Sequence, residues 1–430
     1  MSTLIQPWAS RGQRLVSTRA FILINKVNVT PARSSLATFS TLPALHQRIV
    51  ADFRSDTLTK PTDAMIKEVM LNASRGDDVY EEDEAVRSLE HHVAQLTGHE
   101  AGLFCASGTM TNQLAFKASL LTPPASILCD RRSHVYRYEA GGLASHSQLT
   151  VNPVQAVANK GHHITVQDLE REFVGDDGDV HMAPTRLISL ENTLDGTVMP
   201  LQEVQAIRRF ANENKVRLHL DGARIWNAAV AAGCDLKDYT QEFDSVSLCV
   251  SKGIGAPIGS VLVGDKDLIK KARHFRKMFG GGWRQAGGLA AAAHWCIDNV
   301  WPTMKETHGL ARHLAEGIER VGRGASIYQP VESNMVFLDL AGSGVLLRDL
   351  SKKLLREKGI RIGNEDAAEG QTQVRLVLHW QINRGAVDDF IEVVGVLAEA
   401  SAREGRVSSG NDGENNNNNN KKQQSVYGRR

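Results

Sequence analysis

The sequence predicts an α/β fold, in which a mostly parallel, doubly wound sheet carries helices on both faces and a smaller α+β domain follows. Short apolar runs of strand length alternate with helical stretches between about residues 51 and 403. Reactive polar residues follow several of these runs, as expected at the carboxyl ends of parallel strands. The hydrophobic content of 42% and charged content of 23% are typical of a globular chain with a filled core.

Local patterns predict the elements of the larger domain. Apolar residues recur at helical spacing from Val86 to Leu96 and the pattern stops at Gly98, which predicts a helix over residues 84–97. A helical pattern also covers residues 201–212. Short apolar runs predict five strands, at residues 125–129, 185–190, 216–220, 245–250 and 258–263.

A change of pattern near residue 300 predicts two domains. We expect residues 51–300 to form the large domain, which ends in an Ala-rich helix after Gly287. Residues 301–403 carry a helix at 347–358 and new strands at 334–340 and 374–379. This second set predicts the smaller α+β domain.

The two ends of the chain differ from the middle. Residues 1–50 contain no acidic residue but six Lys and Arg among many Ser and Thr, a composition typical of a mitochondrial transit peptide. The alternative is a disordered extension without a targeting role, so we expect a protein of the mitochondrial matrix or, alternatively, the cytoplasm. Residues 404–430 are polar and contain six consecutive Asn, which predicts a disordered tail.

Charge and cysteine usage narrow the class of protein. The net charge of +1 gives no reason to expect a nucleic-acid or membrane partner, and no stretch is long and apolar enough to span a bilayer. The five cysteines are scattered without C-x-x-C spacing, so we expect reduced thiols in an intracellular compartment rather than disulfides. We expect no metal site.

The most informative feature is an acid and a lysine that each follow an apolar strand. Asp221 ends the run 216–220 in a Gly turn, and Lys252 follows the run 245–250 after Ser251 and before Gly253. A lysine on a Gly-flanked turn can reach a carbonyl cofactor, and a carboxylate at a neighbouring strand end can keep a pyridine nitrogen protonated. The pair indicates pyridoxal 5′-phosphate.

A turn rich in hydroxyl residues and glycine lies upstream of Asp221 and Lys252 and directly precedes a helical pattern. Ser107, Gly108 and Thr109 lie between a short apolar run and a helical pattern, where free backbone N–H groups bind phosphate well. Alone, Ser-Gly-Thr is more often an ordinary helix cap. Its position upstream of Asp221 and Lys252 favours a phosphate site.

Two loops carry further candidates. His134 stands before a double glycine at 141–142, and a histidine in such a loop can stack on a flat cofactor and exchange protons. The alternative is a structural histidine. Arg284 lies in the glycine-rich segment 280–288, which either presents this arginine to a carboxylate or phosphate or forms a plain surface loop.

Arg375 lies within the apolar strand predicted at 374–379. An arginine inside a strand needs a fixed anionic partner. That partner is either a substrate carboxylate or a buried acidic side chain.

Eight motifs together resemble the low-specificity L-threonine aldolases, pyridoxal-phosphate enzymes of fold type I. Over about residues 50–400 the chain has, in order, Asp52-Phe-Arg-Ser55-Asp56-Thr57, Gly76-Asp-Asp-Val-Tyr80, Ser107-Gly108-Thr109, His134-x-Tyr-x-Tyr-Glu-x-Gly-Gly, Glu191-Asn192-Thr193, Asp221-Gly-Ala-Arg224, Ser251-Lys252-Gly and Gly282-x-Arg284-Gln-Ala-Gly. The order makes the resemblance specific, although single motifs are weak.

The resemblance implies a role for each candidate. Lys252, beside Ser251, would bind the cofactor covalently, Asp221 would pair with its ring nitrogen and His134 would stack on the ring. Ser107, Gly108, Thr109 and Arg284, the last from another subunit, would hold its phosphate. The substrate carboxylate would contact Ser55, Arg224 and Arg375, with Tyr80 lining the pocket across an interface. A homotetramer that shares active sites between subunits is implied.

The implied reaction is the retro-aldol cleavage of L-threonine or L-allo-threonine to glycine and acetaldehyde. Some bacterial relatives have a histidine after Glu-Asn-Thr where this chain has Leu194 and then Asp195. This leaves His134 or a bound water as the base for the substrate hydroxyl. The alternatives are an alanine racemase, an aldolase for a bulkier β-hydroxy amino acid, or a catalytically silent interaction protein, although retention of Asp221 and Lys252 argues against the last.

Overall fold

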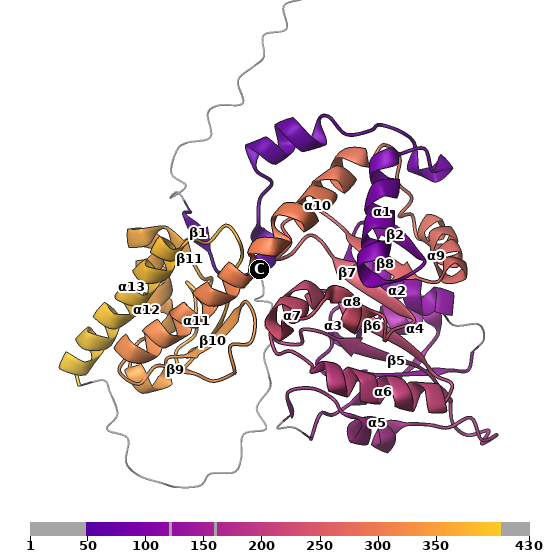
Figure 1. Cartoon of the computed structure of the whole chain (residues 1–430). Helices are drawn as coiled ribbons and strands as arrows, with labels where there is room; N and C mark the ends of the chain where they lie inside the picture. Colours follow the sequence, from indigo (N-terminus) through magenta and orange to yellow (C-terminus); the bar gives the residue numbers. More distant parts are fainter. Residues whose placement is uncertain (1–48, 120–122, 159–160, 406–430) are drawn as a thin grey trace, which may run out of the picture. The chain divides into compact units, whose positions relative to one another are not determined.

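The computed structural model describes residues 49–119, 123–158 and 161–405. Its centre is a seven-stranded sheet in the order β2-β8-β7-β6-β5-β3-β4, covered by helices on both faces (Figure 1). Strand β8 runs antiparallel to both of its neighbours, while β7, β6, β5, β3 and β4 pair in parallel. The predicted mostly parallel α/β fold is confirmed.

Strands of this sheet are short and mostly buried. Each of β3, β7 and β8 is buried at every position, as a sheet covered on both faces requires. The seven strands are β2 (Ala101–Cys105), β3 (Ser126–Asp130), β4 (Thr150–Val154), β5 (Thr185–Glu191), β6 (Arg217–Gly222), β7 (Ser245–Cys249) and β8 (Ser260–Gly264).

Amphipathic helices connect these strands. Helix α1 begins after Asp83, whose side chain accepts the Val86 N–H, and ends at Gly98 in the left-handed conformation. The helices of this part are α1 (Glu84–Thr97), α2 (Gly108–Ser119), α3 (His134–Arg137), α4 (Gly142–Ser147), α5 (Val166–Glu172), α6 (Leu201–Glu213), α7 (Ile225–Ala232), α8 (Leu236–Thr240), α9 (Lys266–Met278) and α10 (Gly287–Asn299).

A second sheet follows, with the strand order β12-β10-β9. Its core includes Val336, Leu338 and Leu376, which are fully buried and pack with helices rather than with the large sheet. Its elements are α11 (Met304–Val321), β9 (Ser326–Ile327), β10 (Met335–Asp339), α12 (Leu347–Lys353), β11 (Ile360–Arg361), β12 (Gln373–Val377) and α13 (Arg384–Arg403), and β11 pairs with β1 (Ala51–Asp52). The described residues belong to one compact unit, so a domain boundary near residue 300 stays a prediction.

Most predicted elements lie within a few residues of the observed ones, but several elements were missed, among them β4, α9, α11 and α13. Strand β4 was missed because it is an edge strand with an exposed Thr150 and contains Pro153, which weakens the strand pattern. The 20-residue helix α13 was also missed, although Val387, Phe390 and Val394 recur at helical spacing. The predicted helix at 347–358 is α12, continued by a wider turn over Leu354–Lys358.

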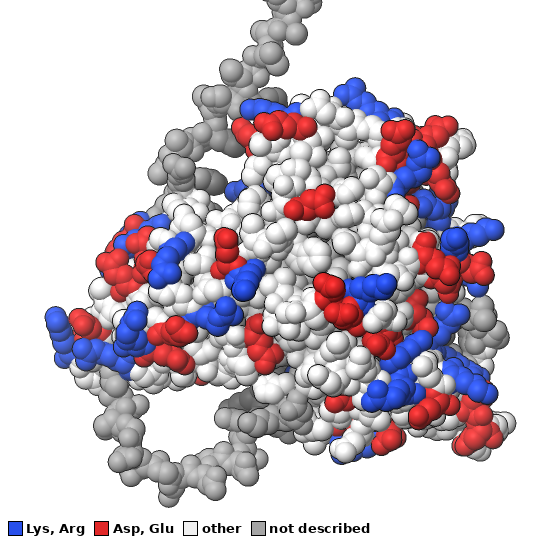
Figure 2. Space-filling model, viewed as in Figure 1, with Lys and Arg blue, Asp and Glu red and all other residues white. Residues whose placement is uncertain are grey.

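Surface charge follows the composition. Positively charged Lys and Arg side chains and negatively charged Asp and Glu side chains are interspersed on the face in Figure 2, in agreement with the net charge of +1. Within the described ranges, no helix combines the length and apolarity that crossing a bilayer requires. Almost all of the predicted leader (residues 1–50) and the tail beyond residue 405 lie outside the described residues.

Candidate active site

Lys252 and Asp221 lie at the same edge of the large sheet. Strands β6 and β7 pair in parallel, with Asp221 opposite Ser247, and Lys252 is the third residue after β7. Lys252 is half-buried, and its charge partly opposes the burial that raises the pKa of Glu191. The neighbouring Ser251 is also half-buried and its hydroxyl lies 3.5 Å from Cys249 Sγ.

The turn after Lys252 requires glycine. Gly255 donates its N–H to Lys252 O at 2.8 Å and has a φ of +91°, a conformation that side chains rarely adopt. A Cβ atom there would lie 2.4 Å from Trp380 Nε1. The small residues around the lysine are therefore a packing requirement of the turn that presents it.

Asp221 is buried and held by two N–H donors. Its Oδ2 accepts from Asn112 Nδ2 at 2.8 Å, and its Oδ1 accepts from the Ala223 N–H at 3.1 Å. Asn112 lies on α2 and also donates to Glu139 Oε1 at 2.9 Å. One amide thus joins two buried carboxylates.

His134 is tied to the same network from the other side. Its Nδ1 lies 3.0 Å from Glu139 Oε1, and its backbone N–H donates to Glu191 Oε2 at 2.7 Å. Burial lowers the pKa of His134, but the hydrogen bond to Glu139 and the charge of Asp221 outweigh burial and raise the pKa above its ordinary value. One ligand atom each of His134, Glu139 and Asp221 lie within 4.8 Å of one another.

A buried histidine orients Asn112. His219 Nε2 lies 3.1 Å from Asn112 Oδ1, and its Nδ1 lies 2.8 Å from Ser245 Oγ. Burial lowers the pKa of His219 to about 4, so the ring is neutral at physiological pH. A neutral ring that donates from Nε2 fixes the amide oxygen of Asn112 and so directs its NH₂ group toward Asp221.

This pKa predicts how stability depends on pH. The unfolded chain protonates His219 near pH 6.5 and the folded chain only near pH 4, so stability is lost as the pH falls between these values, by roughly 3 kcal/mol at most. We expect the thermal midpoint of the cofactor-free protein to fall less steeply over this range in His219→Gln than in wild type. The exposed His181→Gln is the control, and parallel curves for all three proteins would contradict the assignment.

Glu191 and Asp221 form a second pair of close acids. They are opposite each other in the parallel register of β5 and β6. Burial and the charge of Asp221 raise the pKa of Glu191 to about 8, although the His134 N–H and Lys252 oppose this. Two acids in one buried place indicate a site that accepts a cationic group.

The predicted phosphate loop lies at the start of α2. Ser107 Oγ accepts the Met110 N–H at 3.1 Å, so this serine caps the helix. Ser107 is exposed, while Gly108 and Thr109 are half-buried. The buried Ser260 Oγ has no hydrogen-bond partner among the described residues, and a Cβ at Gly108 would lie 3.6 Å from it.

Arg224 forms an ion pair with Asp56, an acid that the sequence analysis did not select as a site residue. Its Nε and Nη2 donate to Asp56 Oδ2 and Oδ1 at 2.8 and 2.7 Å. Burial raises the pKa of Asp56, but Arg224 outweighs it, and the pKa falls to about 2. Asn334 Nδ2 also reaches Asp56 Oδ2 at 3.3 Å, and Ser55 caps the short turn that begins at Asp56. These hydrogen bonds to Asp56 fix the orientation of the Arg224 guanidinium before any substrate binds.

The turn after β5 contains Asp195 and Gly196. Asp195 has a φ of +50°, and Gly196 is held by a 2.6 Å hydrogen bond from Ser333 Oγ to its carbonyl. Burial raises the pKa of Asp195, and the charges of Arg132, Arg375 and Arg224 oppose this rise in part. Leu194, which replaces the histidine of some relatives, is buried.

Arg375 lies on β12 at the edge of this region. In the register of the small sheet it is opposite Phe337, and its Nη2 donates to Arg54 O at 3.4 Å. This hydrogen bond to a backbone carbonyl tests neither of the two predicted anionic partners, a substrate carboxylate or a buried acid, and both stay predictions. Asp195 is the acid whose pKa responds to Arg375.

Within the described part of the chain, two predicted residues form no hydrogen bond or ion pair with the other predicted site residues. Arg284 donates to Asp77 Oδ2 at 3.0 Å, and its side chain is 60% exposed. Tyr80 lies in the turn Asp78–Tyr80 and is 72% exposed. Within one chain, neither residue is brought to Lys252.

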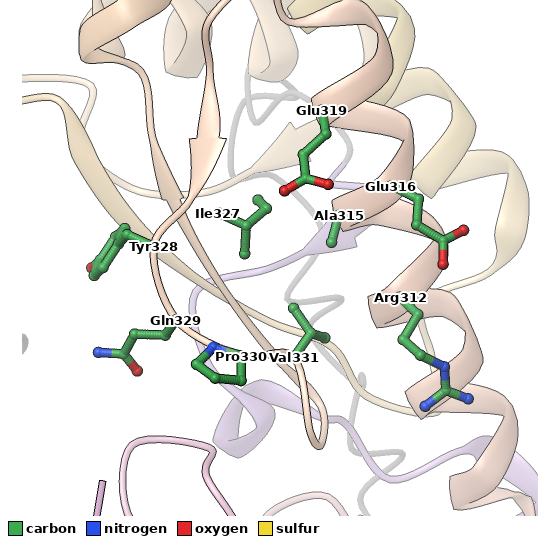
Figure 3. A pocket seen from close by; sticks show the side chains of 9 residues that line it. All are labelled: Arg312, Ala315, Glu316, Glu319, Ile327, Tyr328, Gln329, Pro330 and Val331. Carbon is green, nitrogen blue, oxygen red and sulfur yellow. The ribbon is translucent and has the colours of Figure 1, made fainter. Parts of the chain in front are cut away.

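A surface pocket of about 470 Å³ lies elsewhere, between α11 and the segment that follows β9 (Figure 3). Glu316, Glu319 and Arg312 come from α11, and the ring of Tyr328 points away from that helix. None of the site residues described above lines it. The lining residues are Arg312, Ala315, Glu316, Glu319, Ile327, Tyr328, Gln329, Pro330 and Val331.

Sequence analysis missed the residues that orient the site, namely Asp56, Asn112, Glu139, Glu191 and His219. Asp56, Glu139 and Glu191 stand inside motifs that were recognised, so their position in those motifs was the available signal. Asn112 and His219 are a helix and a strand residue 107 positions apart, and no local pattern distinguishes them from ordinary core polar residues.

Comparisons with known proteins cover most of the chain. The family model of beta-eliminating lyases matches residues 52–343. The low-specificity L-threonine aldolase of Saccharomyces cerevisiae is 47% identical over 81% of this chain and 86% of the yeast protein, and the alanine racemase of Cochliobolus carbonum is 38% identical over 81% and 88%. The solved threonine aldolase of Leishmania major has a TM-score of 0.66 at 21% identity, over 81% and 99%.

Proposed function

Because the chain belongs to the beta-eliminating lyase family, we propose that it is a pyridoxal-phosphate-dependent aldolase that cleaves L-threonine and L-allo-threonine to glycine and acetaldehyde. The observation that carries the proposal is that Lys252 and Asp221 lie at the ends of neighbouring parallel strands, with Asp221 held in a buried polar network. In the reaction the Cα–Cβ bond breaks, the β-hydroxyl proton passes to a base, and Cα takes up a proton.

The site fits the cofactor at three points. The buried Asp221 carboxylate suits a cationic ring nitrogen, and Lys252 offers an amine to the aldehyde. At the phosphate end, the N-terminus of α2 and the unpartnered Ser260 hydroxyl offer donors. When bound, pyridoxal phosphate supplies the electron sink that makes a bond at Cα labile.

Orientation at Cα decides which bond breaks. We assign the substrate carboxylate to Arg375 with Ser55 and Arg224, as the family resemblance implies. Asp56 holds two nitrogens of Arg224, which fixes the orientation of its guanidinium group.

The base for the β-hydroxyl is assigned to His134 or to a water bound beside it. Glu139 accepts from His134 Nδ1, which leaves Nε2 as the ring nitrogen that exchanges a proton. Leu194 supplies no polar side-chain group at the position where some relatives have a histidine, and the half-buried Asp195 follows it in the same turn.

We further propose a homotetramer in which each active site is completed by another subunit. The exposed Tyr80 and Arg284 support this, since both belong to recognised motifs, yet neither forms a hydrogen bond or ion pair with Lys252 among the residues that the structure describes. Localisation to the mitochondrial matrix is supported by the acid-free composition of residues 1–50, with the cytoplasm as the alternative.

The test is acetaldehyde release by the purified, cofactor-loaded protein. We expect acetaldehyde and glycine in equal amounts from L-threonine and from L-allo-threonine, and none from D-threonine. L-Alanine is incubated in parallel, because the Cochliobolus carbonum relative is an alanine racemase. Formation of D-alanine without acetaldehyde from either L-substrate would contradict the aldolase and favour the racemase.

A further inference from the structure

Two histidines and an aspartate meet on the paired helices α1 and α10, apart from the proposed active site. His92 Nε2 lies 3.2 Å from Asp298 Oδ1, and His294 Nε2 lies 3.7 Å from Asp298 Oδ2. One ligand atom from each residue lies within 4.8 Å of the other two. His294 and Asp298 are one turn apart on α10, so one helix offers both on the same face.

The cluster is not an ordinary ion pair. The two imidazole rings stack with their centroids 4.3 Å apart and an angle of 27° between their planes. His92 Nε2 is buried and has no hydrogen-bond partner among the described residues, although the Asp298 carboxylate is close to it.

A neighbouring hydroxyl orients one of the rings. Ser88, one turn before His92 on α1, places its Oγ 3.3 Å from His294 Nδ1. Nε2 is then the nitrogen that faces Asp298. A second hydrogen bond on the far ring nitrogen is the usual support of a metal-binding histidine.

We propose that His92, His294 and Asp298 bind a divalent transition-metal ion, with Zn²⁺ as the best match, and that this ion clamps α1 to α10. Tetrahedral zinc with bonds of about 2.0–2.1 Å places neighbouring ligand atoms about 3.3 Å apart, between the two separations seen here. Two imidazoles and one carboxylate suit zinc rather than Ca²⁺ or Mg²⁺, which prefer oxygen ligands. The half-exposed Asp298 leaves the fourth position to water.

The clamp would act on stability rather than on chemistry. Helix α1 begins after Asp83, and a Cβ at Gly287, the first residue of α10, would lie 2.7 Å from Asp83 Oδ1. The two helices are thus in close contact at their first turns. The ion would join them again near the C-terminal halves of both.

The experiment uses the full-length, cofactor-loaded protein, stripped of metal with a chelator and titrated with ZnCl₂ by calorimetry and thermal melting. We expect one equivalent to bind in the micromolar range or tighter and to raise Tm by a few degrees. Co²⁺ should give the visible d–d bands of a tetrahedral site. CaCl₂ should leave Tm unchanged.

Variants separate this site from adventitious binding. His294→Ala and the milder Asp298→Asn should each weaken Zn²⁺ binding about 10–100-fold, while His91→Ala, an exposed neighbour outside the cluster, should bind as wild type. Circular dichroism confirms that each variant is folded. Unchanged titrations for both Asp298→Asn and His294→Ala, or equal shifts with CaCl₂, would overturn the proposal.

Discussion

Replacement of Lys252 by alanine should lower the rate of acetaldehyde release from L-threonine by about 10⁴-fold or more. The turn of Lys252 is set by Gly255 and packs against Trp380, so no other amine is presented there by the same backbone. The measurement is acetaldehyde production at saturating L-threonine and added pyridoxal phosphate. Wild-type rates in this variant would exclude Lys252 as the cofactor lysine.

Two controls make the result specific. Lys270→Ala removes an exposed lysine from α9 and should retain full activity. Borohydride reduction should fix the cofactor permanently to the wild-type chain, on the peptide that contains Lys252, and should fix none to Lys252→Ala. Label on any other lysine of the wild-type protein would require a different assignment.

The two central residues of the site could be predicted from the sequence because both lie at the ends of strands. Asp221 and Lys252 each follow a short run rich in apolar residues, and the parallel register of β6 and β7 brings these runs side by side. The position of Ser107 before α2 was predictable for the same reason, since a strand, a turn with small residues and a helix leave one pattern in the sequence.

What could not be predicted is the set of contacts between distant residues. Asn112 and Asp221 are 109 positions apart, and Arg224 and Asp56 are 168 apart. Whether Arg224 binds substrate directly or is anchored by an acid depends on which of many acids the fold brings near. Periodicity contains no such information.

Replacement of Asp221 by asparagine should lower kcat about 10³-fold while the cofactor remains attached to Lys252. An amide cannot hold a proton on the ring nitrogen by charge, so the electron sink weakens although its binding site persists. The measurement pairs kcat for L-threonine with cofactor content after gel filtration. Asp267→Asn, an exposed change at the start of α9, is the matched control.

Replacement of Glu191 by glutamine tests which of the two acids, Glu191 or Asp221, pairs with the ring nitrogen of the cofactor. The pKa of Glu191 is raised to about 8, first by burial and then by Asp221, so Glu191 is largely protonated at neutral pH and supplies little negative charge. Two N–H groups donate to Asp221, an arrangement that suits a carboxylate. We therefore expect Glu191→Gln to retain far more activity at pH 7 than Asp221→Asn. The reverse order would assign the ring nitrogen to Glu191, with Asp221 as the acid that perturbs it.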